Sequence, residues 1–221
     1  LWFFSIVIFK LKFPFLKQNI VYGFSKDLVL VDQLASPNPS LVESNYGPIN
    51  DIDAAKRFGT ADLKEYSFWS WRSCGVANVA SILKTLNLFD GSLYNLICEI
   101  KDADGYLFED KYGNKDIGWK HAALVDAFKR RGLNSTILRK VSVEKVLLEV
   151  LSGHLIIASV KSMLINGGSH MIVIKSFTKS DSGIVLNIYN PYNLNGKGGN
   201  TTISIDEFKK IFLNKGINVL I

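Results

Sequence analysis

A cysteine followed directly by a glycine stands at residues 74 and 75, at the head of a stretch with helical apolar periodicity. The pattern predicts a buried helix that begins at Cys74, with Ser73 placed to cap it. A helix N-terminus has unpaired N–H groups and the positive end of the helix dipole. It therefore lowers the pKa of a thiol there and stabilises an oxyanion beside the sulfur. The position of Cys74 favours nucleophilic chemistry.

A structural role is the alternative, because cysteine often packs in protein cores as a small hydrophobic residue. The only other cysteine is Cys98, and a disulfide between the two would remove the nucleophile. Neither cysteine stands in a CxxC or Cys/His spacing, so no metal site is expected. The choice between the two roles depends on a partner base.

Three histidines are candidates for that base. His121 lies in the first turn of an expected helix and His154 at the start of an apolar strand, so structural roles are favoured for both. His170 follows a glycine-rich loop at residues 166–169 and begins another apolar strand. Functional side chains are often mounted at strand ends beside such loops. His170 is therefore the predicted base.

Residues 171–177 and 184–189 alternate as two strands and are predicted to pair as a hairpin centred on Ser180. In this register His170 faces Asn190, with Cβ atoms about 4.5–5.5 Å apart, so the amide oxygen can orient the imidazole. A slip of one residue would undo this alignment. The same parity puts five aliphatic side chains on one buried face: Ile172, Ile174, Ile184, Leu186 and Ile188.

The elements that must position these residues follow from periodicity. Helices are expected at residues 52–58, from 74, and at 92–101, 118–131, 143–151 and 206–212; strands are expected at 28–31, 135–138, 154–160, 171–177, 184–189 and 217–221. Residues 102–118 are expected to form a polar loop. Its acidic residues lack the EF-hand spacing, so a calcium site is not predicted. Helices followed by a sheet predict an α+β fold.

The N-terminal part has a different composition. Residues 1–9 are almost wholly apolar but too few to span a bilayer, which takes roughly 20, so they form a strand or the end of a truncated signal or anchor segment. Residues 35–51 hold three of the five prolines and favour a linker or long loop. We therefore expect residues 1–51 to precede a domain at 52–221. Location in a bacterial cytoplasm and export both stay open.

Composition excludes some partners. The chain has 26 basic and 20 acidic residues among 221, a net charge of +6, but the excess is scattered, with no aromatic-basic stripe. Nucleic-acid binding is therefore not expected. The 48% of hydrophobic residues is enough for a core, and a monomer is expected. Membrane association is expected only through the apolar N-terminal segment.

The combination of motifs resembles the C39-like peptidases, a branch of the papain-like cysteine peptidases. The resemblance covers roughly residues 60–213 and rests on WSWRSCGVANVASIL, GWKHAALVDAFKRRGL, GGSHMIVIKSF and LNIYNPYN. It implies a papain-like fold, Cys74 as nucleophile, His170 as general base and then acid, and Asn190 as the orienting residue. It also implies a peptide or protein substrate and no metal or organic cofactor.

Two positions depart from that family. Its members more often carry Asp where Asn190 precedes the proline, and a neutral residue stabilises an imidazolium less. They also place a Gln about six positions before the cysteine as an oxyanion donor, where this chain has Phe68. The backbone N–H of Cys74 remains a donor. Side-chain candidates for a second donor are Trp69, Ser70, Arg72 and Ser73.

Loss of one oxyanion donor typically lowers the rate by about 10²–10³. An inactive papain-like module that binds peptides, or a glycine-rich tail, in the same groove is therefore the alternative to a cysteine peptidase that cleaves a peptide or isopeptide bond. A third reading is transfer of the acyl group to an amine instead of water, which uses the same residues.

Overall fold

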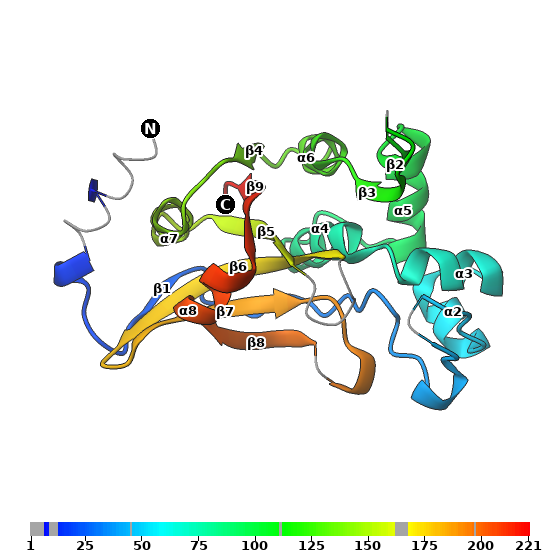
Figure 1. Cartoon of the computed structure of the whole chain (residues 1–221), viewed down its shortest axis with the longest axis horizontal. Helices are drawn as coiled ribbons and strands as arrows, with labels where there is room; N and C mark the ends of the chain where they lie inside the picture. The colour runs from blue at the N-terminus through cyan, green and yellow to red at the C-terminus, as the bar shows by residue number, and fades with distance from the viewer. Residues whose placement is uncertain (1–6, 9–12, 45, 111, 162–167, 197) are drawn as a thin grey trace. The chain divides into compact units, whose positions relative to one another are not determined.

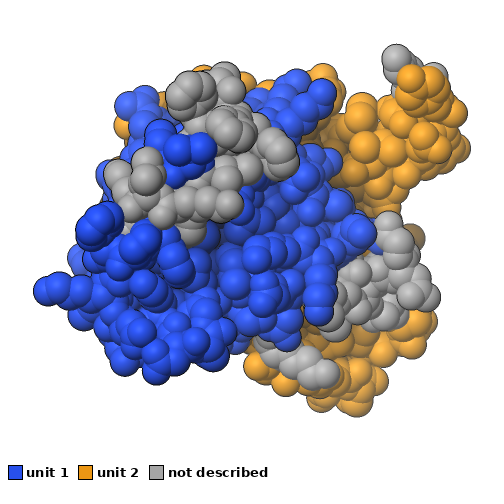
Figure 2. All heavy atoms as spheres, turned by 60° about the vertical axis from the view of Figure 1, so that its left-hand side comes forward, with its two compact units in different colours: residues 1–27, 133–189, 200–221 blue, residues 28–132, 190–199 orange. Residues whose placement is uncertain are grey.

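The computed structural model is shown in Figure 1. It describes residues 7–8, 13–44, 46–110, 112–161, 168–196 and 198–221. The chain forms two compact units, coloured in Figure 2. Unit 1 comprises residues 1–27, 133–189 and 200–221; unit 2 comprises residues 28–132 and 190–199. The apolar run expected at residues 1–9 lies largely outside the described residues. In the part of the chain that the structure describes, no helix has the length and hydropathy needed to cross a membrane.

The α-helices of unit 2 are α2 (Ile52–Phe58), α3 (Leu63–Ser70), α4 (Cys74–Thr85), α5 (Leu93–Asp102) and α6 (His121–Lys129). Aspartate side chains cap the first two, since Asp51 and Asp62 each accept two backbone N–H bonds. A capping box between Ser92 and Asn95 starts α5. The helices expected at residues 52–58, from 74 and at 92–101 are confirmed. The helix expected at 118–131 begins only at His121, because residues 115–119 form a strand. The helix α3 is additional, and sequence periodicity does not single it out.

The expectation of a polar loop at residues 102–118 is wrong in one respect. Two short strands, β2 (Tyr106–Glu109) and β3 (Lys115–Trp119), pair antiparallel inside it as a separate two-stranded sheet. Aromatic rings stabilise this hairpin, because Tyr106 and Trp119 pack edge to face with centroids 4.9 Å apart. The segment is rich in polar residues, so its sequence does not indicate that Tyr106 and Trp119 pair two strands.

The strand expected at residues 28–31 is also absent, and this segment has no regular secondary structure. Its backbone is bound by side chains of α4 instead of a neighbouring strand. Val29 N donates to Thr85 Oγ1 over 2.8 Å, and Ser81 Oγ donates to Val29 O over 2.5 Å. Farther along, residues 35–51 contain a 3-10 helix, Pro39–Leu41, and pack into unit 2 with Ile49 fully buried.

Unit 1 is built on an antiparallel sheet with strand order β4-β9-β5-β6-β7-β8, and β1 pairs with residues 176–178 of β6 on the edge opposite to β7. The strands are β1 (Val21–Gly23), β4 (Ser135–Arg139), β5 (Leu155–Lys161), β6 (Ser169–Ser180), β7 (Gly183–Asn190), β8 (Gly199–Ser204) and β9 (Phe212–Val219). The helices of this unit are α7 (Val143–Leu151) and α8 (Ile205–Ile211). The bounds of α7, α8, β4, β5 and β7 agree with those expected to within one residue. Strand β6 extends beyond the expected residues 171–177, and β9 begins five residues before the expected 217 and ends at 219. Strands β1 and β8 are not predicted by the sequence.

One face of the sheet carries a hydrophobic cluster with α7 and α8. Val146 and Val150 of α7 and Phe208 of α8 are fully buried in it. The five aliphatic residues predicted to share a face, Ile172, Ile174, Ile184, Leu186 and Ile188, all belong to this cluster. Together with the helices of unit 2, this sheet confirms the α+β class.

The register of the β6–β7 hairpin corrects the predicted alignment. The turn is tighter than expected, since Ser180 pairs with Gly183 and only two residues separate them. A register shift between Ile174 and Ser176 follows, so Tyr189 pairs with Val173 and not with Met171. The two-residue offset means that Asn190 is not directly opposite His170. Because the offset is even at this end, each residue keeps the predicted face of its strand.

Candidate active site

Cys74 is the first residue of α4, and it is half-buried. It forms no disulfide with Cys98, which lies within α5. Ser73 occupies the N-cap position but makes no side-chain cap hydrogen bond, which contradicts its expected role. Its hydroxyl donates to Gln33 O over 3.3 Å instead. The Ser73 side chain therefore does not bind the N–H groups in the first turn of α4, as an N-cap serine usually does.

The short turn before Cys74 is fastened to distant segments of unit 2. Trp71 Nε1 donates to Gly47 O over 2.8 Å, and Trp119 Nε1 donates to Arg72 O over 2.7 Å. Both indole rings are buried, so each N–H needs such a partner. These bonds hold the start of α4 against residues 46–47 and against the β2–β3 hairpin.

An ion pair lies in the same turn. Arg72 binds Asp116 of β3 with two nitrogens, at 2.9 Å from Nε to Oδ1 and 2.6 Å from Nη2 to Oδ2. The hydroxyl of Tyr106 also donates to Asp116. Burial opposes ionisation of this carboxyl group, but the bonds from Arg72 and Tyr106 outweigh it and lower the pKa of Asp116. The network therefore places a positive charge on Arg72, two residues before Cys74, and pairs it with the negative charge of Asp116.

Aromatic rings surround this network. Trp69 packs against Tyr106 and Trp119, with centroid distances of 5.2 and 5.5 Å. Phe68, at the position where the family resemblance implies a Gln, is 37% exposed. The Arg72 guanidinium lies 4.0 Å from the centre of the Phe68 ring. Position 68 thus supports Arg72 and offers no side-chain hydrogen bond.

The side chains considered as second oxyanion donors all donate within unit 2. Trp69 Nε1 donates to Glu65 Oε2 over 2.9 Å, and Ser70 Oγ donates to Ser67 O over 3.2 Å. Arg72 Nη1, the guanidinium nitrogen that does not bind Asp116, donates to Phe68 O over 2.9 Å. Their service as oxyanion donors stays a prediction.

Tyr46 is a residue of this region that sequence reasoning did not single out. Its ring packs against Trp71 with centroids 5.8 Å apart, and Arg72 lies 5.6 Å from its centre. Burial, followed by the negative charge of an ionised Cys74, raises the pKa of the Tyr46 hydroxyl. Nothing in the sequence reveals this, because Tyr46 lies in the segment whose composition favours a linker.

The predicted base and orienting residue lie in the strands of the hairpin. His170 is half-buried in β6 of unit 1 and pairs with Val160 of β5. Asn190 is the last residue of β7, and its Oδ1 accepts the N–H of Tyr192 over 3.1 Å. Cys74 and Asn190 belong to unit 2 and His170 to unit 1. The convergence of the three side chains therefore stays a prediction.

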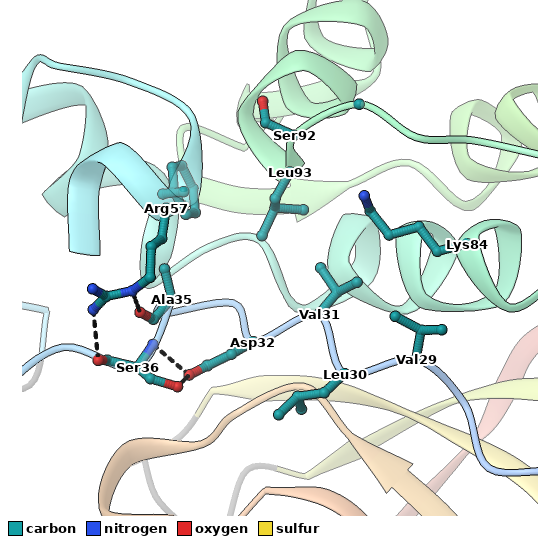
Figure 3. A pocket seen from close by; sticks show the side chains of 12 residues that line it. Val29, Leu30, Val31, Asp32, Ala35, Ser36, Arg57, Lys84, Ser92 and Leu93 are labelled. Carbon is teal, nitrogen blue, oxygen red and sulfur yellow. Dashed lines mark hydrogen bonds between the residues drawn. The ribbon is translucent and has the colours of Figure 1, made fainter. Parts of the chain in front are cut away.

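Unit 2 also contains a cavity of about 420 Å³, shown in Figure 3. Its lining is partly apolar, with Leu30 and Leu93, and partly charged, with Asp32, Arg57 and Lys84. Arg57 donates to the carbonyl oxygens of Ala35 and Ser36 over 3.2 and 3.1 Å. This arginine therefore ties residues 35–36 to α2. Among the described residues, no cluster of three or more His, Cys, Asp or Glu could hold a metal ion.

Comparison with known proteins shows the fold. No protein-family model and no curated protein matches the chain. Among solved structures, a putative C39-like peptidase from Bacillus anthracis is similar with a TM-score of 0.51 and 12% identity, over 68% of this chain and 89% of that one. The chain thus has the α+β fold of C39-like, papain-like peptidases.

Two further solved structures are similar over about the same part. The peptidase domain of Streptococcus ComA, a bifunctional ABC transporter involved in quorum sensing, has a TM-score of 0.47 and 19% identity, over 67% of this chain and 90% of that one. A double glycine motif protease from an AMS/PCAT transporter, in complex with a leader peptide, has a TM-score of 0.41 and 19% identity, over 66% and 82%.

Proposed function

We propose that this chain, which has the fold of C39-like peptidases, is a thiol-dependent hydrolase that cleaves a peptide or isopeptide bond. The observation that carries the proposal is the position of Cys74 as the first residue of a helix whose N-cap side chain does not cap it. The helix dipole and the first-turn N–H groups then favour a thiolate and an oxyanion beside it. His170 is the proposed base and Asn190 the proposed orienting residue.

The reaction follows from these groups. His170 takes the proton of Cys74, and the thiolate attacks the carbonyl carbon of the scissile bond. The tetrahedral intermediate collapses with cleavage of the C–N bond, and His170 returns the proton to the leaving amine. Water, deprotonated by His170, then attacks the thioester. Collapse of this second intermediate releases the carboxylic acid and restores the Cys74 thiol.

An inactive module that binds peptides is the second candidate. Phe68 favours it, because this position carries no side-chain donor for the oxyanion. Transfer of the acyl group to an amine is a variant of the first proposal, and product analysis with added amines separates it from hydrolysis. In each case the partner is a peptide or protein.

The test is the pH dependence of alkylation by iodoacetamide in a Cys98→Ser background, where Cys74 is the only thiol. A peptidase should show stoichiometric labelling at about pH 7, below the ordinary thiol pKa of about 8.5, because the thiolate is already formed. The His170→Ala variant should lose this reactivity roughly tenfold, and the His121→Ala variant should keep it. A thiol that reacts only as the pH approaches about 8.5 would favour the binding module.

A further inference from the structure

The proposed reaction needs two hydrogen bonds to the oxyanion, and the structure leaves one of them without an obvious donor. The backbone N–H of Cys74 can supply the first. At residue 68, where the family resemblance implies a Gln, the phenyl ring of Phe68 lies against the Arg72 guanidinium at 4.0 Å. Arg72 itself is bound by Asp116 and by Phe68 O. The side chains of Trp69, Ser70 and Ser73 also donate to other partners. A donor from another segment near this turn is therefore the better candidate.

Tyr46 is held beside the residues that precede the thiol. Its ring packs against Trp71 at 5.8 Å and against the Arg72 guanidinium at 5.6 Å between centres. Trp71 Nε1 also donates to the carbonyl oxygen of Gly47, the residue that follows Tyr46, over 2.8 Å. Two consecutive side chains of the turn before Cys74 thus fix the position of the Tyr46 ring.

The backbone of Tyr46 is itself unusual, with φ at +64°. A bulky aromatic residue rarely adopts this left-handed conformation, which costs of order 1 kcal/mol or more and persists where the surroundings impose it. The bond from Trp71 to Gly47 and the ring contacts are such surroundings. The side chain is nevertheless 41% exposed, so a substrate can reach it.

The pKa of the Tyr46 hydroxyl is raised above its ordinary value. Burial is the main cause that raises its pKa, and the charge of an ionised Cys74 is the next, ahead of the opposing effect of Arg72. A raised pKa keeps the phenol protonated when Cys74 is a thiolate. It therefore remains a hydrogen-bond donor throughout the reaction.

We propose that the Tyr46 hydroxyl is the second oxyanion donor for acyl transfer at Cys74. The inference rests on the proposed function and assigns the missing part of its site. When the thiolate adds to the carbonyl carbon, the C–S bond forms and the π electrons move to the oxygen. Tyr46 O–H and Cys74 N–H donate to that oxygen without losing their protons, and the bonds weaken again when the intermediate collapses.

Two reactions of the same thiol separate this role from others. Acylation by N-acetylglycine p-nitrophenyl ester passes through a tetrahedral oxyanion, whereas alkylation by iodoacetamide is a direct displacement without one. In the full chain with Cys98→Ser, Tyr46→Phe should slow acylation of Cys74 by about 10²-fold. It should leave the rate and pH profile of alkylation within about twofold, because the neutral phenol adds no charge. Tyr112→Phe, a change in the β2–β3 hairpin, is the matched control for both reactions.

The outcomes separate cleanly. Slowed acylation with unchanged alkylation supports the inference. Acylation of the Tyr46→Phe variant at the wild-type rate, or equal losses in both reactions, overturns it and leaves the proposed function standing. If the wild-type protein forms no acyl-enzyme at Cys74 under these conditions, the proposed function and this inference are overturned together.

Discussion

At the scale of single residues, opposite charges lie beside the candidate nucleophile. Arg72 and Asp116 form an ion pair through two nitrogens and two oxygens. The charges of both, and that of an ionised Cys74, affect the pKa of the Tyr46 hydroxyl. Because Arg72 stands two residues before Cys74, we expect the pair to influence ionisation of the thiol, and its two members to act with opposite sign. A thiolate is favoured by the guanidinium and disfavoured by the carboxylate.

This arrangement predicts opposite effects of two neutralising substitutions. In the Cys98→Ser background, Arg72→Gln leaves the Asp116 carboxylate uncompensated and should slow iodoacetamide alkylation of Cys74 at about pH 7 by roughly threefold. Asp116→Asn leaves the guanidinium and should accelerate it by roughly the same factor. The double variant should return near the wild-type rate.

Arg130→Gln breaks an ion pair with Glu99 elsewhere in unit 2 and serves as the control. It should change the alkylation rate little. If Arg72→Gln and Asp116→Asn shift the rate in the same direction, the effect comes from altered packing and the electrostatic account is wrong.

At this scale the sequence predicted where Cys74 lies in its helix but not which partner Ser73 binds. The Cys-Gly pair at a helix start singled out Cys74, and the structure confirms that α4 begins there. Ser73, in contrast, has the residue type of an N-cap but binds Gln33. A capping residue usually has an extended backbone, whereas Ser73 has φ −87° and ψ 9°, so residue type alone does not decide capping.

At the scale of elements, α7 carries a charged network inside unit 1. Glu149 accepts hydrogen bonds from His154 and Asn218, each at 2.9 Å, and pairs with Lys145. Burial opposes its charge, but these partners outweigh it and lower the pKa of Glu149 below the ordinary 4.5. A group with a depressed pKa stabilises the fold above its unfolded value, and this contribution is lost as the pH falls through the folded value.

Glu149→Gln should therefore lower the free energy of unfolding by about 1 kcal/mol at about pH 6. The difference from the wild type should shrink as the pH falls below 4.5, because the carboxyl group then becomes neutral as well. Thermal unfolding at several pH values measures it. Glu144→Gln, in the first turn of the same helix, is the control. A destabilisation that stays constant down to about pH 3 would contradict this assignment.

Helices and strands with a clear period of apolar residues could be predicted from the sequence. Elements that depend on a few contacts between distant residues could not. The helix at Val143–Leu151 has the bounds expected from its apolar stripe. The β2–β3 hairpin was missed because its stability comes from Tyr106 and Trp119 meeting across the strands and from Asp116 binding Arg72. Such contacts join residues far apart in the sequence and leave no period.

At the scale of the whole molecule, the sheet of unit 1 is assembled from distant parts of the chain. Strand β9, near the end of the described chain, lies between β4 and β5. Gly216 makes this insertion possible, because it pairs with Ala158 and a Cβ there would lie 2.3 Å from Ile157 O. A side chain at this position would force the two backbones apart.

Gly216→Ala should accordingly destabilise the protein by about 2 kcal/mol, as overpacking of a tight interior does. Denaturant unfolding followed by circular dichroism measures the loss. The neighbouring Lys215 is exposed in the same strand, so Lys215→Ala should change stability by no more than about 0.5 kcal/mol. Equal stability of the wild type and Gly216→Ala would show that β9 does not approach β5 so closely.

The sequence by itself determined the α+β class, most helices and strands, and the placement of a thiol at a helix start. These follow from residue periodicity and composition within one segment, which local chemistry controls. Only the tertiary structure decided the hairpin register, the place of β9 in the sheet, the network around Arg72 and the packing of Tyr46 on Trp71 and Arg72. Each depends on packing between segments far apart in the chain, where a two-residue shift or one buried ring changes which side chains meet.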